Sequence, residues 1–322
     1  MPDQRFPLHS KVGPFFLFEE LASNGQMAWV YRAGLRQAPE RQVVLKIARA
    51  DGEYQHIFEQ LLRHEANLLR DFRHPGIVHI CPIIAYDRTL YIARAQYLAP
   101  YCHDVAPWYF AMEWLRGGSL EHHIHTMQNF PLPWKIELIY QIAIILDYIH
   151  LRGTAHLDLK PSNILFREPP HPERVPHPVL IDFGIAENES LAQHLPAATL
   201  RYAAPERVEP MSNQRAITPI VTGDNVNHPP ADIFALGVIA YEILTGYYPF
   251  TLGNNREDLA YSILNEEPPS VAQWGLPAEV DRLLRLMLMK NREERPTIDQ
   301  LITRLDTRLN LGPPRVSITS TS

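Results

Sequence analysis

Three polar side chains stand at short, fixed intervals in the segment 156–163 and could serve a transfer reaction. Asp158 can accept the proton of a hydroxyl group. Lys160 would point to the same side of an extended loop and could neutralise a phosphoryl group in transit. Asn163 offers an oxygen ligand suited to Mg²⁺. Phosphoryl transfer depends on positioning and charge neutralisation more than on covalent chemistry, so these residue types fit it.

Two charged residues in apolar surroundings need a partner. Lys46 lies inside an apolar, β-branched run, and strand alternation places it on the same face as Val44. Glu65 falls on the apolar face of an expected helix, where a carboxylate is costly unless it is paired. If strand and helix pack together, Glu65 would hold Lys46, and Lys46 would hold the α- and β-phosphates of a nucleotide. The alternative for Lys46 taken alone is an edge-strand lysine that reaches water.

Asp182 is placed to hold a metal ion. It ends an apolar run, and Phe183 and Gly184 follow it. Aspartate and glycine favour turns, so a plain strand-ending turn would explain Asp182 if it stood alone. The presence of Asp158 and Asn163 in the same chain favours the metal.

Composition narrows the class of protein. The chain has 322 residues, enough for two lobes, and 46% of them are hydrophobic. The net charge of −6 gives no reason to expect nucleic acid or an anionic membrane as partner. Cys81 and Cys102 are the two cysteines, so a disulfide framework is not expected and a reducing compartment, the cytoplasm, is favoured. Because Gln141 and Asp147 interrupt the most apolar run, 139–149, we expect a buried helix there and no membrane span.

The elements that must position these residues follow a clear order. Strands joined by turns are expected over 15–45, with Asn24-Gly25 as the clearest turn, and another strand over 109–112. A helix is expected over 54–72. Its apolar face is predicted to carry Leu61, Leu68 and Phe72.

Beyond Gly118 the pattern becomes helical. Helices are expected over 134–150, 231–244 and 281–289, and the second, apolar on nearly every side, should lie inside a helical core. The expected organisation is a lead-in over 1–14, a small strand-rich lobe over 15–112, a hinge over 113–118, a larger helical lobe over 119–311 and a disordered tail over 312–322.

Further segments join these residues into a recognisable series. They are the strand 43–46 that ends in Lys46, the helix segment 63–65 that ends in Glu65, the segments 112–115, 199–206 and 232–237, and Arg295, which would pair with Glu206. In this order, over roughly residues 15–310, the series resembles the protein kinase family. Lys160 and Thr199 resemble the serine/threonine branch, and the similarity leans toward bacterial kinases of the eukaryotic-like (Hanks) type.

The resemblance implies a two-lobed α+β fold, with a small antiparallel-sheet lobe carrying one main helix and a larger, mostly helical lobe. It implies ATP in the cleft between the lobes and Mg²⁺ on Asn163 and Asp182. Asp158, Lys160, Lys46 and Glu65 would be catalytic, and the substrates would be serine or threonine hydroxyls of proteins. The nucleotide contacts would be Ser23, Gly25, Ala28, Val30, Val44, Lys46, Met112, the backbones of Glu113 and Leu115, and Leu165.

The segment 23–30 departs from the family pattern. The expected G-x-G-x-x-G-x-V keeps only its middle glycine, Gly25, so we expect ATP to bind, but less tightly. Val44 replaces the usual alanine above adenine and narrows the roof of the pocket. A pseudokinase scaffold is the alternative that this degraded loop supports. A kinase of small molecules is a second alternative, against which the segment 199–206 and Arg295 argue.

Leu157 replaces the arginine that in this family contacts a phosphate on the activation loop. Between Asp182 and Glu206, Ser190 is the only hydroxyl besides Thr199 and Tyr202, and the nearby Glu187 and Glu189 would repel a phosphate on it. We therefore expect activity without activation-loop phosphorylation.

Other features are expected to be structural. His122, His123 and His125 lack a carboxylate or cysteine that would complete a metal site. Leu69, Ile80, His156 and Phe183 should be core residues and, by resemblance, the stacked column of an active kinase.

Insertions over 93–107, 167–178 and 208–230 should lie on the surface. The last could shape a substrate or partner site, although a passive loop is the simpler interpretation. The oligomeric state stays open.

Overall fold

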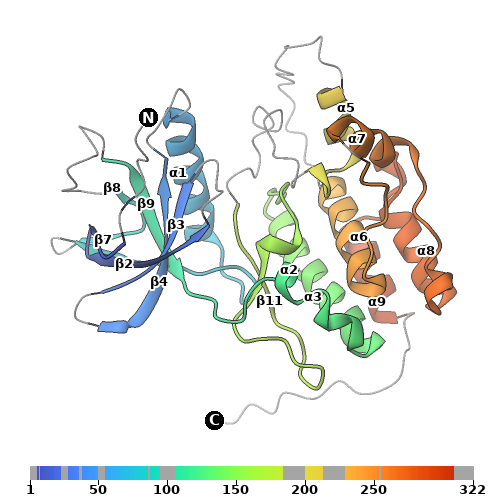
Figure 1. Cartoon of the computed structure of the whole chain (residues 1–322), viewed down its shortest axis with the longest axis horizontal. Helices are drawn as coiled ribbons and strands as arrows, with labels where there is room; N and C mark the ends of the chain where they lie inside the picture. The colour runs from blue at the N-terminus through green and yellow to red at the C-terminus, as the bar shows by residue number, and fades with distance from the viewer. Residues whose placement is uncertain are drawn as a thin grey trace. The chain divides into compact units, whose positions relative to one another are not determined.

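The computed structural model of the chain (Figure 1) describes residues 6, 8–22, 28–35, 38–49, 55–85, 88–94, 106–183, 200–212, 229–253 and 255–307. Contacts between Cα atoms divide the chain into two compact units. Unit 1 comprises Met1–Leu115 and Asp182–Gly184, and unit 2 comprises Arg116–Ile181 and Ile185–Ser322.

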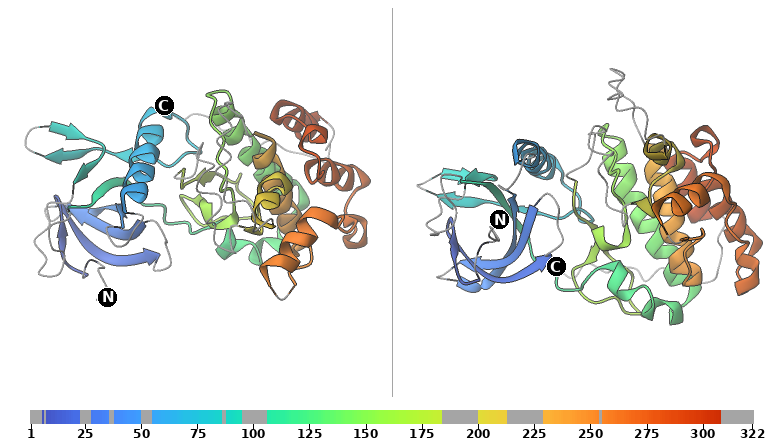
Figure 2. Two further views of the ribbon diagram at one scale, coloured as in Figure 1. Left: turned by 90° about the horizontal axis from the view of Figure 1, so that it is seen from above. Right: turned by 45° about the horizontal axis from the view of Figure 1, so that its top comes forward.

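Unit 1 is built on an antiparallel sheet with the strand order β1-β2-β3-β4-β9-β5, and β8 pairs with β9. A separate hairpin joins β6 to β7. Helix α1 (Gln55–Asp71) contacts β4, β9 and β5 (Figures 1 and 2). The strands are β1 (Lys11–Val12), β2 (Phe15–Ala22), β3 (Ala28–Leu35), β4 (Ala38–Ala48), β5 (Ile80–Cys81), β6 (Ile83–Ala85), β7 (Arg88–Leu90), β8 (Ala93–Arg94) and β9 (Trp108–Glu113).

One face of the sheet closes an apolar core. Trp29 and Tyr31 of β3 alternate onto this face together with Leu45 and Ile47 of β4, and all four side chains are buried. The segment before β2 also contributes, because Phe6 is 3% exposed and packs edge-on against Trp29 with ring centroids 5.5 Å apart. The lead-in expected over 1–14 therefore takes part in the core of unit 1.

The buried stripe of α1 differs in detail from the prediction. Leu61, Glu65 and Leu69 are buried at intervals of four residues, whereas Leu68 is half-buried. Successive residues of a helix are rotated by about 100°. Leu68 therefore lies at the edge of a stripe whose centre runs through Glu65 and Leu69, and its assignment to the buried face was wrong.

Unit 2 is mostly helical, with α6 at its centre. Residues 231–245 of α6 are all buried, as its apolar sequence predicted. Gly237 allows α8 to approach α6, since a Cβ at this position would lie 2.9 Å from the Cβ of Met287. The α-helices are α2 (Leu120–His123), α3 (Leu132–His150), α5 (Pro205–Ser212), α6 (Pro229–Thr245), α7 (Arg256–Asn265), α8 (Ala278–Met287) and α9 (Ile298–Thr307).

Shorter elements complete unit 2. The strands β10 (Ile164–Phe166) and β11 (Pro178–Leu180) form a hairpin, and the 3-10 helices are η1 (Thr126–Asn129), η2 (Pro161–Asn163), η4 (Val271–Trp274) and η5 (Arg292–Glu294). Helix α8 begins three residues before the start expected at Asp281, because it follows Pro277 directly. Among the helices that the structure describes, none has both the length and the apolar character that crossing a membrane requires.

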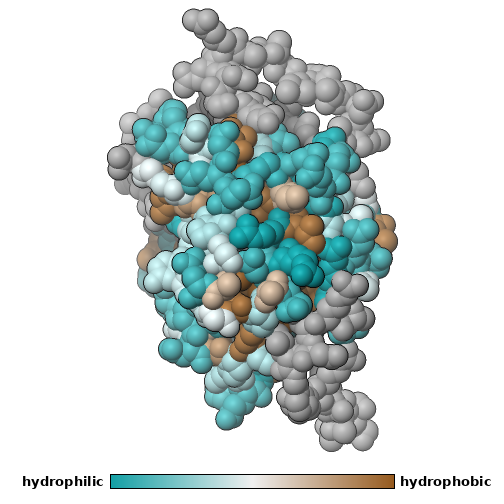
Figure 3. Space-filling model, turned by 90° about the vertical axis from the view of Figure 1, so that its right-hand side faces the viewer, coloured by the Kyte–Doolittle hydropathy of each residue, from teal (hydrophilic) through white to brown (hydrophobic). Residues whose placement is uncertain are grey.

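The predicted insertions differ in how they are built. Most residues of the segment 167–178 are exposed, as expected, but the carbonyl of Arg174 accepts a hydrogen bond from Trp134 Nε1 at 2.6 Å. The ends of the segment 208–230 are helical, in α5 and α6, so the expectation of a loop was wrong there. Its middle and most of the segment 93–107 lie outside the described residues. The face in Figure 3 is mainly hydrophilic with small apolar patches, which is ordinary for a protein surface.

Candidate active site

Unit 1 contains the predicted ion pair between a strand lysine and a helix glutamate. Lys46 of β4 places its Nζ 2.7 Å from Oε2 of Glu65 in α1 and 2.8 Å from Oδ1 of Asp182. Glu65 is 1% exposed, and the backbone of Phe183 adds a hydrogen bond to its carboxylate. Lys46 thus binds two carboxylates, where the sequence predicted one.

Burial and charge shift both partners of this pair. Burial lowers the pKa of Lys46, but the carboxylates of Asp182 and Glu65 outweigh it and raise that pKa, so the ammonium group stays charged. Burial raises the pKa of Glu65 to about 7, and the charge of Asp182 adds to the rise while Lys46 opposes it. A buried carboxylate that shares one cation with a second carboxylate is held near its protonation point.

The sheet brings the predicted nucleotide contacts of unit 1 onto the face that carries Lys46. Val30 lies opposite Lys46 in the β3–β4 register, and Met112 lies opposite Val44 in the β4–β9 register. Paired residues and residues two apart on a strand share a face. Ala28 is on this face as well, since it pairs with Ala48. Ser23 and Gly25 lie outside the described residues.

At the end of β9, the backbone N–H of Glu113 already has a hydrogen-bond partner. The N–H of Glu113 donates to the carbonyl of His79 at 2.9 Å, and Glu113 Oε1 accepts from the N–H of His79 at 2.9 Å. A contact from the Glu113 backbone to adenine would therefore use its carbonyl. Leu115, also expected at the hinge, is buried.

Unit 2 brings together the three polar residues of the segment 156–163. Lys160 Nζ lies 2.8 Å from Asp158 Oδ2, and Asn163 Nδ2 donates to the same oxygen at 3.1 Å and to the Asp158 carbonyl at 2.9 Å. Asp158 is 6% exposed, and its Oδ1 is buried without a hydrogen-bond partner among the described residues. One carboxylate oxygen is thus fixed by two donors, and the other accepts no hydrogen bond from the described residues.

The β10–β11 hairpin fixes the end of this segment. Asn163 directly precedes β10, and its carbonyl accepts from the N–H of Ile181, which directly follows β11, at 3.0 Å. Ile181 also accepts from His156 Nε2 at 3.0 Å. Leu165 pairs with Val179 in the hairpin and is half-buried. Asp182 is the next residue after Ile181 in the chain and belongs to unit 1.

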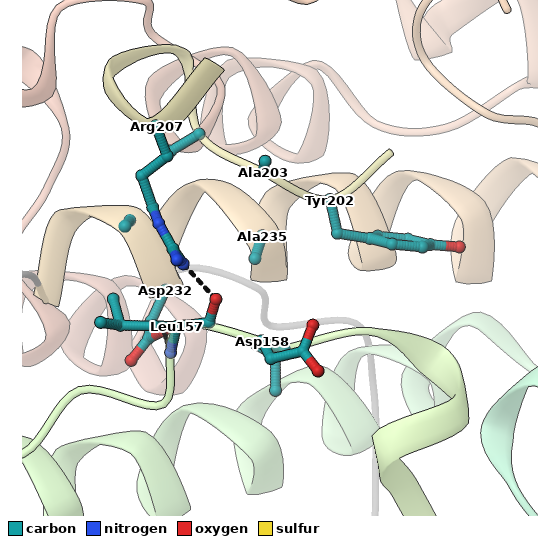
Figure 4. Close-up of a pocket in the computed structure, with 10 residues that line it drawn as sticks. Leu157, Asp158, Tyr202, Ala203, Arg207, Asp232 and Ala235 are labelled. Carbon is teal, nitrogen blue, oxygen red and sulfur yellow. Dashed lines mark hydrogen bonds between the residues drawn. The ribbon is translucent and has the colours of Figure 1, made fainter. Parts of the chain in front are cut away.

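Asp232 of α6 holds the start of the segment through its backbone. Its Oδ2 accepts from the N–H of His156 at 2.8 Å and from His150 Nε2 at 2.9 Å, and its Oδ1 accepts from the N–H of Leu157 at 2.9 Å. Burial would raise the pKa of Asp232, but its hydrogen bonds and electrostatic interactions with His150 and His156 outweigh it and lower that pKa. Figure 4 shows Asp232 beside Leu157.

Backbone strain marks the same region. Three described non-glycine residues have left-handed φ angles, namely His9 (66°), Leu157 (61°) and Asp182 (66°). This conformation costs a non-glycine residue about 1–2 kcal/mol. Two of the three adjoin or form the predicted site, where strain is usually retained for function.

Comparison with known proteins identifies the family. The family model described as "Protein kinase domain" matches residues 18–304. The chain belongs to the protein kinase family. A serine/threonine-protein kinase PknB of Mycobacterium tuberculosis is 30% identical over 263 residues, which are 79% of this chain and 36% of that protein. A probable serine/threonine-protein kinase PknB of Bifidobacterium longum is 28% identical over 312 residues, 94% of this chain and 41% of that protein.

The kinase fold extends to more distant relatives. A solved structure of Rad53 residues 1–466 in complex with AMP-PNP matches with a TM-score of 0.65 and 21% identity, covering 90% of this chain and 64% of that one. The two-lobed kinase fold expected from the sequence, and the resemblance to bacterial serine/threonine kinases, are therefore confirmed. The chain spans less than half the length of the bacterial relatives named above.

The predicted pair between Arg295 and Glu206 is present in unit 2. Arg295 donates from Nη1 and Nη2 to the two carboxylate oxygens of Glu206, each at 2.8 Å, as the sequence predicted. The side chain of Arg295 is 0% exposed and that of Glu206 is 23% exposed, so the pair is partly shielded from water. Nearby, Tyr202 donates its hydroxyl to Glu242 of α6 at 2.9 Å. Thr199 and Gly184 lie outside the described residues.

The residues predicted to hold Mg²⁺ fit that ion. The amide nitrogen of Asn163 is engaged by Asp158, which leaves the amide oxygen as its possible metal ligand. Asp182 supplies a carboxylate. Oxygen donors of this kind, one or two per ion together with substrate phosphates, are what Mg²⁺ takes in phosphoryl-transfer enzymes.

Sequence reasoning assigned no role to two residues that the structure places beside Asp158. Asp232 was read as the start of the central helix, although a carboxylate inside an apolar run was a signal that it has partners. Arg207 of α5 donates from Nη1 to the carbonyl of Leu157. Its partner is a backbone group, and side-chain patterns carry no signal for such a contact.

The histidines considered as metal ligands make other contacts. His122 and His123 end the short helix α2, with their rings edge-on at 4.9 Å. His123 Nε2 lies 2.6 Å from the carbonyl of Gly117. The four residues of the expected column are all buried. Leu69, Ile80 and Phe183 lie in unit 1, and His156 lies in unit 2.

Proposed function

We propose that this chain is a protein kinase that transfers the γ-phosphate of Mg·ATP to serine or threonine hydroxyls of proteins. The observation that carries the proposal is the Asp158 carboxylate, one oxygen of which is fixed by Lys160 and Asn163 while the other is buried and has no hydrogen-bond partner in the part of the chain that the structure describes. An unpaired buried acceptor costs about 1–3 kcal/mol, and an incoming hydroxyl donor would relieve that cost.

Asp158 orients the acceptor hydroxyl through Oδ1 and takes its proton. The hydroxyl oxygen forms a bond to the γ-phosphorus while the bond from that phosphorus to the β–γ bridging oxygen breaks, and ADP leaves with the electron pair. Lys160, held at Asp158, supports the γ-phosphoryl oxygens as charge shifts toward ADP. Little covalent chemistry falls to the protein, so fixed geometry and charge supply most of the acceleration.

Unit 1 anchors the rest of the nucleotide. Lys46, braced by Glu65, binds the α- and β-phosphates, and the face with Ala28, Val30, Val44 and Met112 contacts adenine. Ser23, Gly25, Leu165 and the backbones of Glu113 and Leu115 complete the proposed nucleotide contacts. Mg²⁺ held by Asn163 and Asp182 would neutralise charge on the phosphate oxygens.

A transfer assay tests this proposal against its alternatives. The protein is incubated with γ-labelled ATP, Mg²⁺ and a generic protein substrate, with Asp158→Asn as the inactive control. We expect label on serine or threonine that disappears in Asp158→Asn. Nucleotide binding without transfer by the unaltered protein would instead indicate a pseudokinase scaffold. Label on a small molecule but not on protein would indicate a small-molecule kinase.

We also propose that activity does not require phosphorylation of the activation loop. The support is Leu157, which cannot bind a phosphate, together with the single serine of that loop, Ser190, which follows Glu187 and Glu189 closely. The protein treated with phosphatase should keep its activity, and Ser190→Ala should match it. Loss of activity in both samples would refute the idea.

The cellular setting is a proposal from composition. Two cysteines in 322 residues, of which Cys81 is a free thiol, suit a reducing compartment, and we place this chain in the cytoplasm. Its partners would be protein substrates, and its acidic net charge does not favour nucleic acid.

A further inference from the structure

Arg207 reaches the backbone one peptide bond from Asp158. It lies in α5, and its guanidinium donates from Nη1 to the carbonyl of Leu157 (Figure 4). That carbonyl and the N–H of Asp158 belong to the same planar peptide unit. Any rotation of this unit turns the Cα of Asp158 and with it the carboxylate. The Arg207 side chain therefore acts on Asp158 through the backbone.

The other polar groups of this stretch of backbone are also engaged. Asp232 accepts from the N–H groups of His156 and Leu157, at 2.8 Å and 2.9 Å. The N–H of Asp158 points to His156 Nδ1 at 3.4 Å, a long contact. The N–H side of the Leu157–Asp158 peptide unit is thus held weakly, and its carbonyl side is held by the charged donor of Arg207. Hydrogen bonds from an ionised donor are about twice as strong as neutral ones.

This stretch needs to be held. Leu157 has a φ of 61°, a left-handed conformation that is unfavourable for leucine and persists only when the surroundings impose it. Leu157 is buried. A cavity of about 10 Å³ lies beside it and is also lined by Asp158, Tyr202, Arg207 and Asp232. A space of that size has room for about one water molecule.

We propose that Arg207 is a positioning residue for phosphoryl transfer, which fixes the orientation of the Asp158 carboxylate by holding the Leu157–Asp158 peptide unit. This inference rests on the proposed function. Position 157 itself carries no charge in this chain, and the cation that steadies the loop comes from α5. The hydrogen bond from Arg207 goes to Leu157, which is not among the residues assigned to the nucleotide, so losing it should lower kcat and leave the KM for ATP unchanged.

The kinetic test compares Arg207→Met, Arg207→Lys and Arg282→Met with the unaltered protein. Arg282 is an exposed arginine of α8 and serves as the matched control. Arg207→Met keeps the length of the side chain but removes its donors. We expect kcat to fall by about tenfold to a hundredfold, because small misplacements of catalytic groups cost that much. The KM for ATP should stay within about twofold, Arg207→Lys should recover part of kcat, and Arg282→Met should change neither.

A second measurement does not depend on activity. Amide hydrogen exchange is followed in the nucleotide-free proteins for peptides covering 154–160. We expect faster exchange there in Arg207→Met, partial restoration in Arg207→Lys and no change in Arg282→Met. If Arg207→Met does not fold, kcat, the KM for ATP and amide exchange are measured on Arg207→Lys instead. We then expect an intermediate loss of kcat.

The possible results separate the two proposals. Unchanged kcat and unchanged exchange in Arg207→Met would overturn the positioning role while leaving kinase activity intact. A rise in KM for ATP with constant kcat would also overturn it. If the unaltered protein transferred no phosphate, the proposed function would fail, and the exchange data alone would still show whether Arg207 holds the loop.

Discussion

The ammonium group of Lys46 lies 2.7 Å from the carboxylate of Glu65 and ties the middle of β4 to the buried stripe of α1. The pair sets the lysine in a fixed position on the face of the sheet that carries the proposed adenine contacts. Neither residue would be stable there alone, because a buried charge without a partner is strongly unfavourable.

Replacing Lys46 by methionine should impair catalysis, and it should also destabilise unit 1 because the buried Glu65 loses its cation. The variant keeps the length of the side chain but loses the charge that is proposed to hold the α- and β-phosphates. We expect kcat/KM for ATP to fall by about a hundredfold or more, the loss typical for one preorganised electrostatic contact. Lys11→Met, at an exposed lysine of β1, is the control and should be unaffected. Equal activity of the two variants would refute the assigned role of Lys46.

Replacing Glu65 by glutamine should change how stability depends on pH. The folded-state pKa of Glu65 is raised from 4.5 to about 7, so between these values the folded state holds a proton that the unfolded state has released. Its contribution to stability is therefore fully present below pH 4.5 and lost as pH rises through 7. In Glu65→Gln this loss should be absent, and the variant should gain about 1–3 kcal/mol relative to the unaltered protein between pH 5 and pH 8.

Urea unfolding of the metal-free, nucleotide-free protein measures this difference at several pH values. Parallel stability curves for the two proteins would contradict the raised pKa. Glu65→Gln should still lose kinase activity at pH 8, since it no longer anchors Lys46 by charge, and this would separate the role in function from the cost in stability.

Replacing Phe6 by alanine should destabilise unit 1. Phe6 is 3% exposed and packs edge-on against Trp29 and Tyr31, with ring centroids 5.5 Å and 6.4 Å away. Truncating a buried phenylalanine costs about 3–5 kcal/mol. Leu8→Ala, at a residue 49% exposed, should cost less than about 1 kcal/mol. If thermal unfolding moved equally in both variants, Phe6 would not be part of the core.

Breaking the Arg295–Glu206 pair should cost more than breaking a surface pair. Arg295→Met leaves Glu206 and the carbonyls of Pro230, Met289 and Lys290 without their guanidinium donor. We expect a loss of about 3–5 kcal/mol. Arg295→Lys should recover only part of it, because lysine cannot bind both oxygens in the fork geometry. A loss below about 1 kcal/mol by urea unfolding would contradict this.

The sequence predicted those features of the fold and the site that depend on a periodic pattern of side chains. Lys46 and Glu65 were found because charges in apolar periodic segments require partners, and α6 because a helix apolar on all sides must be buried. Asp158 and Asn163 are close in sequence, so a short loop joins them whatever the rest of the fold. Their roles in transfer stay predictions until activity is measured.

What the sequence did not indicate lacks such a pattern. Phe6 is a single aromatic residue beside a proline, and only the tertiary fold brings it to Trp29. Arg207 looks like any polar residue of a short helix, and its partner is a backbone carbonyl 50 residues away in the chain. The exact buried stripe of α1 depended on how the helix is rotated about its axis, which sets Leu69 inside and Leu68 at the edge.

The central claim is that Asp158 drives phosphoryl transfer from bound ATP to a protein hydroxyl. A single-turnover measurement tests it most directly, with ATP affinity determined on the same samples of the unaltered protein and Asp158→Asn. The account predicts that both proteins bind Mg·ATP with similar affinity and that transfer to serine or threonine falls by at least about a hundredfold in Asp158→Asn. Equal transfer rates in the two proteins, or no transfer by the unaltered protein with ATP bound, would contradict it.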